Sequence, residues 1–202
     1  MNDYFELSAK TKILWDTREE MYKDILTGGV GAEIGVFNGD NSSNLLEIVE
    51  PKKLYLIDRW VMQKAPAELI EEHDARKANV YATLGEDPRV EILEMSSEDA
   101  SYEIPKKSLD WLFIDGNHAY AAALWDLQLY LPLVKVGGIV MLHDFTIHIS
   151  RGAVIEAVDY QLRTHGDMEV IGKTREYNRS GLKEPTIALK KTRHKEIYKT
   201  WW

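Results

Sequence analysis

The sequence predicts an α/β protein whose mostly parallel sheet is covered by helices on both faces. Seven short apolar runs alternate with helical patterns along the chain, which is the order that builds a parallel sheet. Five of these runs are nearly continuous, as burial on both faces requires. The connection from Arg175 to Glu184 is short and contains no helical pattern, which permits an antiparallel last strand.

The individual elements follow from hydrophobic periodicity and from the residues that interrupt it. Strands are expected at 30–37, 53–58, 89–94, 109–115, 137–142, 168–173 and 185–191. Helices are expected at 4–27, 41–50, 66–84, 119–131 and 151–164. Ser96 and Ser97 could also begin a helix, because acidic residues follow them in what would be its first turn.

The composition is that of an ordinary globular protein, with 202 residues, 45% of them hydrophobic and 29% charged. A net charge of −8 argues against a general nucleic-acid binder, which must neutralise phosphates. No apolar run approaches the roughly 20 residues that span a bilayer, and no targeting signal is visible, so we expect a cytoplasmic protein. The absence of cysteine excludes thiolate metal sites and cysteine nucleophiles.

The segment Val30–Asp40 is the most informative about function. Its apolar run leads into Gly35 and Gly39 and then into a helix start, an arrangement that brings backbone N–H groups close to a ligand. The next apolar run ends in Asp58, 19 residues past Gly39. In nucleotide-binding α/β folds an acid at about that distance holds the ribose hydroxyls. The order of strand, glycine turn, helix, strand and acid therefore predicts a ribose-bearing cofactor.

Polar residues follow the other predicted strands as well, at the sheet edge where ligands bind in such folds. Besides Glu33 and Asp58 they are Ser42, Arg59, Ser96, Ser97, Glu98, Asp115, Asn117, His118, His143 and Asp144, with Gly116 following Asp115. Each also has a structural explanation, since the acids could cap a helix or form a turn and the histidines could cap a helix or end a strand. Trp60, Trp111 and Trp125 are expected in the core or at its rim.

Asp115, His143 and Asp144 also match a site for a divalent cation. Oxygen ligands with one imidazole suit Mg²⁺, Mn²⁺ or Ca²⁺ better than a structural zinc ion. Such an ion could hold two substrate oxygens and lower the pKa of a substrate hydroxyl. Because two adjacent carboxylates would repel without a cation, we expect a metal between Asp115 and Asp144.

Four segments together resemble the class I S-adenosylmethionine-dependent methyltransferases. The pattern is most similar to small-molecule O-methyltransferases of the macrocin O-methyltransferase-like and cephalosporin hydroxylase-like group. The segments are Ala-Glu-Ile-Gly-Val-Phe-Asn-Gly (32–39), Leu-Ile-Asp (56–58), Phe-Ile-Asp-Gly-Asn-His-Ala-Tyr (113–120) and Leu-Pro-Leu-Val-Lys-Val-Gly-Gly-Ile-Val-Met-Leu-His-Asp (131–144). The resemblance runs from about Val30 to Lys191. It implies a Rossmann-like, doubly wound sheet of seven strands with the last one antiparallel.

The resemblance also implies S-adenosylmethionine as the cofactor and assigns residues to it. Glu33, Gly35, Gly39 and Ser42 would surround its methionine part, Asp58 would bind the ribose, and Ser97 with Glu98 would bind the adenine. Phe37, Arg59, Asp115 and His118 complete the expected cofactor contacts.

Catalytic and metal-binding roles follow from the same resemblance. Metal-dependent relatives place an acid at the end of strand four and an acidic or amide pair at the end of strand five; Asp115 and Asp144 match, and His143 departs from that pair. Some relatives carry a proposed base two residues past the strand-four acid. Here that residue is Asn117, so proton removal would pass to His118 or His143, beside Asp115. We favour His143, because Asp144 could orient it.

The leading expectation is methyl transfer to a hydroxyl on a sugar, glycolipid or secondary metabolite. A nicotinamide-dependent oxidoreductase is disfavoured because the glycine spacing is Gly-x-x-x-Gly, and a non-catalytic cofactor-binding or assembly subunit is the other alternative. We expect residues 1–29 to form a helical cap on the substrate side, 30–192 the cofactor-binding domain, and 193–202 a basic tail with Trp201 and Trp202. The expected partner is a small molecule, and a homo-oligomer is possible.

Overall fold

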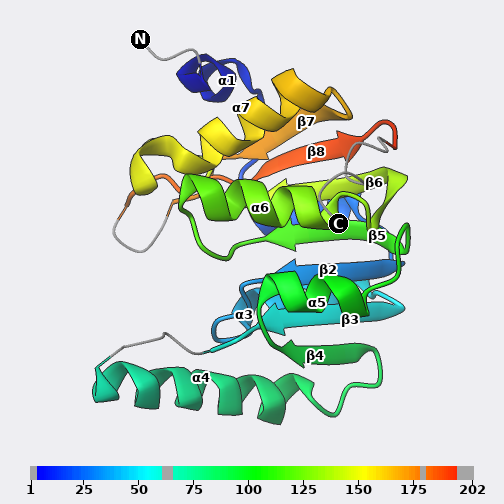
Figure 1. Ribbon diagram of the computed structural model, residues 1–202, viewed down its shortest axis with the longest axis vertical. Coiled ribbons are helices and arrows are strands. Elements are labelled where there is room, and N and C mark those ends of the chain that lie inside the picture. The colour runs from blue at the N-terminus through cyan, green and yellow to red at the C-terminus, as the bar shows by residue number, and fades with distance from the viewer. Residues whose placement is uncertain (1–3, 61–65, 178–180, 195–202) are drawn as a thin grey trace.

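A computed structural model describes residues 4–60, 66–177 and 181–194. In these ranges one eight-stranded sheet carries helices on both faces (Figure 1). The elements are α1 (Tyr4–Lys10), β1 (Ile13–Trp15), α2 (Arg18–Ile25), β2 (Val30–Ile34), α3 (Asp40–Val49), β3 (Lys53–Asp58), α4 (Ala67–Leu84), β4 (Val90–Glu94), α5 (Ser97–Glu103), β5 (Leu109–Ile114), α6 (Tyr120–Tyr130), β6 (Val134–Leu142), a 3₁₀ turn (Ser150–Gly152), α7 (Ala153–His165), β7 (Met168–Thr174) and β8 (Ile187–Lys191).

The strand order is β1-β7-β8-β6-β5-β2-β3-β4. Only β8 among these strands runs antiparallel to its neighbours, β6 and β7, which confirms the mostly parallel sheet with a reversed last strand. Helices α5, α6 and α7 lie in front of the sheet in Figure 1, and α3 lies behind it. The chain reverses its direction of winding between β2 and β5, which is where ligands bind in such sheets.

Each face of the sheet has its own hydrophobic core. One core contains Ala100 of α5, Leu127 of α6 and Ile155 of α7. The other contains Tyr22 of α2 and Leu45 of α3, together with residues of α4. Two-sided burial explains why the central strands are nearly continuous apolar runs.

The single helix expected at 4–27 is wrong. In its place the structure has α1, the three-residue strand β1 and α2, so the sheet gains an eighth strand. Strand β1 is held by backbone hydrogen bonds to β7, such as the one from the Lys173 N–H to the Lys12 carbonyl. Helix α2 then starts afresh at Thr17, whose hydroxyl accepts from the Glu20 N–H. Tertiary pairing therefore overrides the helical spacing of these apolar residues.

The other elements differ from expectation mainly at their ends. Strand β2 stops at Ile34 rather than 37, because Gly35 and Phe37 both have positive φ angles, 88° and 54°. Ser96 caps helix α5 by accepting from the Asp99 N–H, so the helix start at these serines is confirmed. Helix α4 begins after Pro66, so Asp58 does not cap it.

The expected basic tail, including Trp201 and Trp202, lies outside the described residues from position 195 onward. Among the helices that the structure does describe, each is too short or too polar to cross a membrane.

Candidate active site

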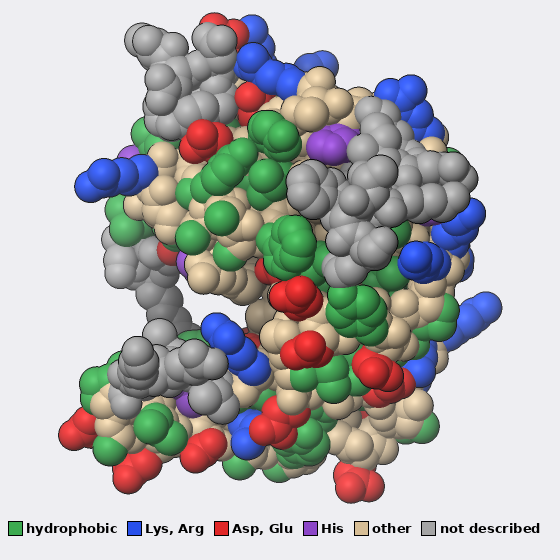
Figure 2. Space-filling model, in the orientation of Figure 1, with side chains coloured by type: hydrophobic (Ala, Val, Ile, Leu, Met, Phe, Trp, Pro, Cys, Tyr) green, Lys and Arg blue, Asp and Glu red, His purple; other side chains and the backbone are tan. Residues whose placement is uncertain are grey.

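A cavity of about 620 Å³ lies at the carboxyl ends of β2, β3, β4 and β5. Its size falls in the range of small-molecule sites. It is lined by the segments that follow these strands, by residues of α6 and by His73 of α4. Figure 2 shows the molecule hollowed on this side, between α4 and the body of the domain. Most of the polar residues expected at the strand ends therefore line one cavity, whereas Glu33, Ser42, His143 and Asp144 do not.

Eight of the eleven expected cofactor residues line this cavity. They are Gly35, Phe37, Asp58, Arg59, Ser97, Glu98, Asp115 and His118. The other three, Glu33, Gly39 and Ser42, lie in and below the glycine turn instead. Gly39 begins α3 with a φ angle of 85°, a backbone conformation that favours glycine.

Glu33 is buried beneath the turn with a 1% exposed surface. The Asn41 amide donates to its Oε1 at 2.9 Å, and the Ser42 hydroxyl donates to its Oε2. Burial raises the pKa of Glu33 to about 7, although both hydrogen bonds act in the opposite direction. These contacts tie the first turn of α3 to strand β2 and thereby fix the glycine turn between them.

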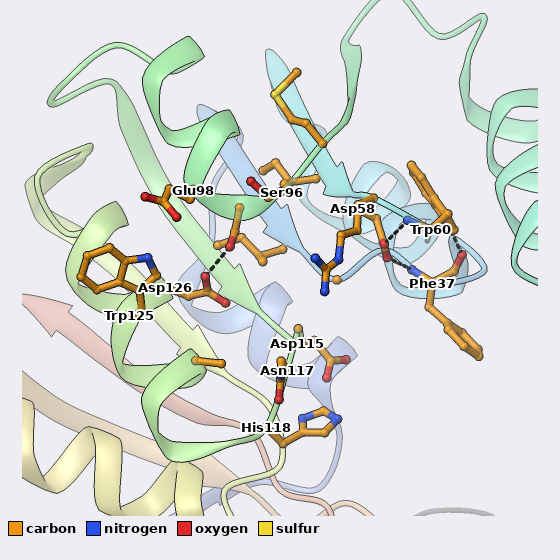
Figure 3. Close-up of a pocket in the computed structure, with 18 of the residues that line it drawn as sticks. Phe37, Asp58, Trp60, Ser96, Glu98, Asp115, Asn117, His118, Trp125 and Asp126 are labelled. Carbon is orange, nitrogen blue, oxygen red and sulfur yellow. Dashed lines mark hydrogen bonds between the residues drawn. The ribbon is translucent and has the colours of Figure 1, made fainter. Parts of the chain in front are cut away.

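Asp58 connects the glycine turn to the end of β3 (Figure 3). Its carboxylate accepts from the Phe37 N–H at 2.9 Å and from the Trp60 N–H at 2.8 Å. The Trp60 indole in turn donates to the Phe37 carbonyl at 2.8 Å. A carboxylate offers about four acceptor positions, so Asp58, which lines the cavity, keeps capacity for two further donors. That capacity suits a pair of vicinal hydroxyls.

The opposite end of the cavity is built by α5 and α6. The Ser97 hydroxyl donates to Asp126 at 2.5 Å, and Trp125 lies beside this pair (Figure 3). Asp126 is 5% exposed, and burial raises its pKa to about 6. The sequence reasoning missed Asp126 and placed Trp60 and Trp125 in the core or at its rim. Trp60 is indeed buried, whereas Trp125 is 44% exposed, and both line the cavity.

A signal for the missed residues exists in the sequence. Ala122 lies three residues before Trp125 and four before Asp126, so these residues lie on one side of the helix that contains them. All three line the cavity, as does His118, two residues before the helix begins. Reading that face from the strand-four motif onward would have found Trp125 and Asp126.

Two acids and two histidines lie together at the ends of β5 and β6. His118 Nδ1 lies 2.7 Å from Asp144 Oδ2. His143 Nδ1 lies 3.2 Å from Asp115 Oδ1 and 3.3 Å from Asp144 Oδ1. Asp115 and His118 face the cavity (Figure 3), whereas Asp144 is buried with 3% of its surface exposed. The structure therefore brings together all four residues that the sequence proposed for catalysis or metal binding.

The charges of this cluster are strongly coupled. Burial by itself lowers the pKa of His143, but Asp115 and Asp144 outweigh burial and raise it to about 10. Burial raises the pKa of Asp144, but the two histidines outweigh burial and hold it well below its usual range. The hydrogen bond to Asp144 raises the pKa of His118. An imidazolium at His143 thus compensates the two carboxylates.

The donor set also fits a divalent cation. Ligand atoms of Asp115, His118 and Asp144 lie within 4.8 Å of one another. His143 belongs to a second group of this kind, with Asp144 and Glu184. The carboxylates of Asp115 and Asp144 therefore lie near each other, with His118 and His143 both beside them, and metal binding by these residues stays a prediction.

The fold and this cavity define a class I methyltransferase: a doubly wound sheet with a reversed last strand and a nucleotide-sized site over the glycine turn. Residues 32–145 match the family described as "Methyltransferase domain". The match covers more than half of the chain, and the protein belongs to this family. No curated protein matches the chain.

Solved structures share the fold at low sequence identity. The O-methyltransferase TomG from Streptomyces achromogenes, in complex with SAM, has a TM-score of 0.60 and 17% identity over 86% of this chain and 77% of its own. SMU.1697c from Streptococcus mutans, in complex with SAH, has a TM-score of 0.58 and 12% identity, and the match covers 95% of this chain and 99% of SMU.1697c. An rRNA methylase from Streptococcus thermophilus has a TM-score of 0.58 and 14% identity over 87% and 94%.

Proposed function

We propose that this protein transfers a methyl group from S-adenosylmethionine to a hydroxyl of a small molecule such as a sugar, glycolipid or secondary metabolite. The observation that carries the proposal is the cluster of Asp115, His118 and Asp144 at the end of the cofactor cavity. O-methylation needs a group that accepts the hydroxyl proton, and this cluster offers one at the cavity end. TomG, an O-methyltransferase in complex with SAM, has the same fold.

Asp58 and the helix α6 face would hold the adenosine. The two acceptor positions left on Asp58 suit the ribose hydroxyls, because charge-assisted hydrogen bonds of this kind are strong. Ser97, Glu98 and Trp125 surround the far end of the cavity, where the adenine would lie. Bound S-adenosylmethionine supplies an activated methyl group on sulfur. The acceptor oxygen forms the new bond to carbon as the carbon–sulfur bond breaks with its electron pair.

We propose His118 as the base, in preference to His143. If the His118 Nδ1–H donates to Asp144, the Nε2 lone pair is the one available for the acceptor proton. Its side chain is 40% exposed, whereas that of His143 is 11% exposed and lies between two carboxylates. The neighbouring acids raise the pKa of both histidines, that of His143 to about 10, so His143 already carries its proton at neutral pH and the more exposed His118 is the better candidate.

A divalent cation held by Asp115, Asp144 and His118 is a second candidate feature of the site. It would supply Lewis-acid stabilisation of the acceptor oxygen. The two proposals use His118 differently, as base or as ligand, and chelation separates them. Activity that survives complete removal of metal ions assigns His118 to proton transfer.

Residues 1–29 would form part of the acceptor side, with 30–192 as the cofactor-binding domain. Elements α1, β1 and α2 pack against α7, β7 and α3, and the Tyr22 ring of α2 lies 6.1 Å from the Phe113 ring of β5. A small-molecule acceptor fits this arrangement. Self-association and a cytoplasmic location remain predictions.

Isothermal titration calorimetry with S-adenosylhomocysteine tests the cofactor, and a methyl-transfer assay over hydroxylated sugars, phenols and lipids tests the acceptor. Saturable binding of S-adenosylhomocysteine and a product heavier by one methylene are expected. NAD binding without S-adenosylhomocysteine binding would overturn the proposal.

A further inference from the structure

Arg18, the first residue of α2, is a partly buried cation at the edge of the site. Its side chain is 26% exposed. Its Nε donates to Glu176 Oε1 at 2.9 Å, and its backbone N–H donates to the same oxygen at 3.1 Å. The ion pair joins residues that are 158 positions apart, so only the folded chain brings it into being.

The Glu176 carboxylate accepts further hydrogen bonds that fix its position. Its Oε2 accepts from the Thr174 hydroxyl at 2.8 Å and from the Thr186 hydroxyl at 3.3 Å. Four donors thus fix a carboxylate that is 14% exposed. A guanidinium held at Nε has a defined plane. Its two Nη groups therefore form a pair of donors with a fixed geometry, called the fork below.

That fork has no acceptor in the described parts of the chain. The hydrogen bonds of Arg18 found there involve Nε and the backbone N–H, and neither Nη is a buried atom. The nearby acids already have partners: Asn41 and Ser42 bond to Glu33, and His143 lies at Asp115. An acceptor for the Nη groups must therefore come from solvent or from a ligand.

Arg18 lies next to the reacting end of the site. Its Cζ is 5.9 Å from the centre of the Phe113 ring, and Phe113 precedes Asp115 by two residues on β5. The same ring lies 6.5 Å from that of His143. The charge of Arg18 acts on both Glu33 and Asp115. Arg18 thus lies close enough to Glu33 and to Asp115, which Figure 3 labels at the cavity, to interact with both electrostatically.

We propose that Arg18 binds a carboxylate of a ligand through its two Nη groups, with Glu176 as the residue that positions it. Resting on the proposed function, this assigns the carboxylate either to the methionine part of the cofactor or to an acidic acceptor. A planar, fixed guanidinium matches a carboxylate with two parallel hydrogen bonds, and partial burial strengthens them.

The first arm of the test separates a ligand carboxylate from a structural ion pair. Calorimetry compares S-adenosylhomocysteine with 5′-methylthioadenosine, which shares the adenosine but lacks the amino-acid part. Arg18→Gln should weaken S-adenosylhomocysteine binding by about 10- to 100-fold, the size of a charged hydrogen-bonded pair. Its binding of 5′-methylthioadenosine should stay within about twofold of the original protein.

Three further variants control the first arm. Arg18→Lys keeps the charge beside Glu176 but lacks the two Nη groups. This variant should fold normally and still bind S-adenosylhomocysteine more weakly, with its affinity for 5′-methylthioadenosine unchanged. Glu176→Gln should reproduce part of the same selective loss. Arg163→Gln removes an arginine paired with Asp159 on α7 and should leave the affinity for both ligands unchanged. Equal losses for both ligands in Arg18→Gln, tracking a lowered melting temperature, would show a structural role and overturn the proposal.

The second arm tests the acceptor as the source. With S-adenosylhomocysteine saturating, calorimetry compares caffeate with methyl caffeate and glucuronate with glucose. A preference for the acid that disappears in Arg18→Gln, with unchanged S-adenosylhomocysteine affinity, assigns the carboxylate to the acceptor. If Arg18→Gln changes neither the affinity for S-adenosylhomocysteine nor the preference for acidic acceptors, the inference is overturned. If the original protein does not bind S-adenosylhomocysteine at all, the proposed function itself fails, which is a distinct result.

Discussion

His118 Nδ1 lies 2.7 Å from Asp144 Oδ2, so a residue at the start of the α6 segment is oriented by the acid that follows β6. His118 reaches the cavity while Asp144 is buried behind it. A buried carboxylate that fixes an imidazole tautomer is a common way to prepare a base. In the proposed function, this pair orients the base toward the side of the cavity where the acceptor would bind.

The first prediction concerns this pair. With an acceptor found by screening, His118→Ala should lower turnover about 10²-fold or more, the usual size of a general-base contribution. Its affinity for S-adenosylhomocysteine should change little, because the residues proposed to hold the adenosine, such as Asp58 and Ser97, lie elsewhere in the cavity. Asp144→Asn should also lower turnover, and His148→Ala, an exposed histidine four residues further on, is the matched control. Near-normal turnover in both His118→Ala and His143→Ala would mean that neither is the base.

The second prediction concerns Asp58. Asp58→Ala should weaken S-adenosylhomocysteine binding by roughly 1–3 kcal/mol, because two charge-assisted hydrogen bonds to the ribose are lost. The variant should also lose its preference for adenosine over 2′,3′-dideoxyadenosine, which separates the ribose contact from the support of Phe37 and Trp60. Glu94→Gln, whose residue pairs with Asp58 in the β3–β4 register, is the control. A preserved preference in Asp58→Ala would refute the ribose assignment.

The third prediction concerns the metal. Electron paramagnetic resonance should detect binding of Mn²⁺ to the protein, and Asp115→Asn should abolish it because half of the carboxylate pair is removed. Asp74→Asn, an exposed acid on α4, should bind Mn²⁺ normally. Activity that is unchanged after exhaustive chelation would remove the cation from the reaction.

The fourth prediction concerns the pH dependence of stability. The pKa of Glu33 rises from 4.5 to about 7 on folding, so between these values the folded state keeps a proton that the unfolded state has lost. Stability from this group therefore falls as pH rises through that window, by about 2 kcal/mol between pH 5 and pH 8. Glu33→Gln should lack this fall in urea unfolding, whereas Glu47→Gln on the exposed side of α3 should retain it. The same pH dependence in all three proteins would contradict the assignment.

The fifth prediction uses two glycines with the same backbone angle. Gly35 and Gly137 both have a φ of 88°. A Cβ on Gly35 would lie 2.1 Å from the Asp115 carbonyl oxygen, whereas a Cβ on Gly137 would meet nothing within 4 Å. Gly137→Ala should cost about 1 kcal/mol of backbone strain. Gly35→Ala should cost about 1–3 kcal/mol more in denaturant unfolding, because β2 and β5 must separate; equal costs would show that this approach is not tight.

Local chemistry accounts for the features that could be predicted from the sequence. The alternation of strands and helices, the turn at Gly35 and Gly39, and the acids Asp58 and Asp115 at strand ends all follow from hydrophobic period and turn residues within short stretches. These features define the fold class and the position of the cavity, because parallel strands place their carboxyl ends at one edge.

The contacts between elements that are distant in the sequence follow from the packing of the folded chain. Strand β1 is three residues long and is held by backbone hydrogen bonds to β7. It is too short for an alternation of polar and apolar residues to predict it. Asp126 joins the site because α6 packs beside α5, and Arg18 acquires Glu176 across 158 positions. The choice between His118 and His143 likewise depended on burial and on the carboxylates around each ring. Periodicity records which face of an element is buried, whereas the partner across that face is set by the packing of the whole chain.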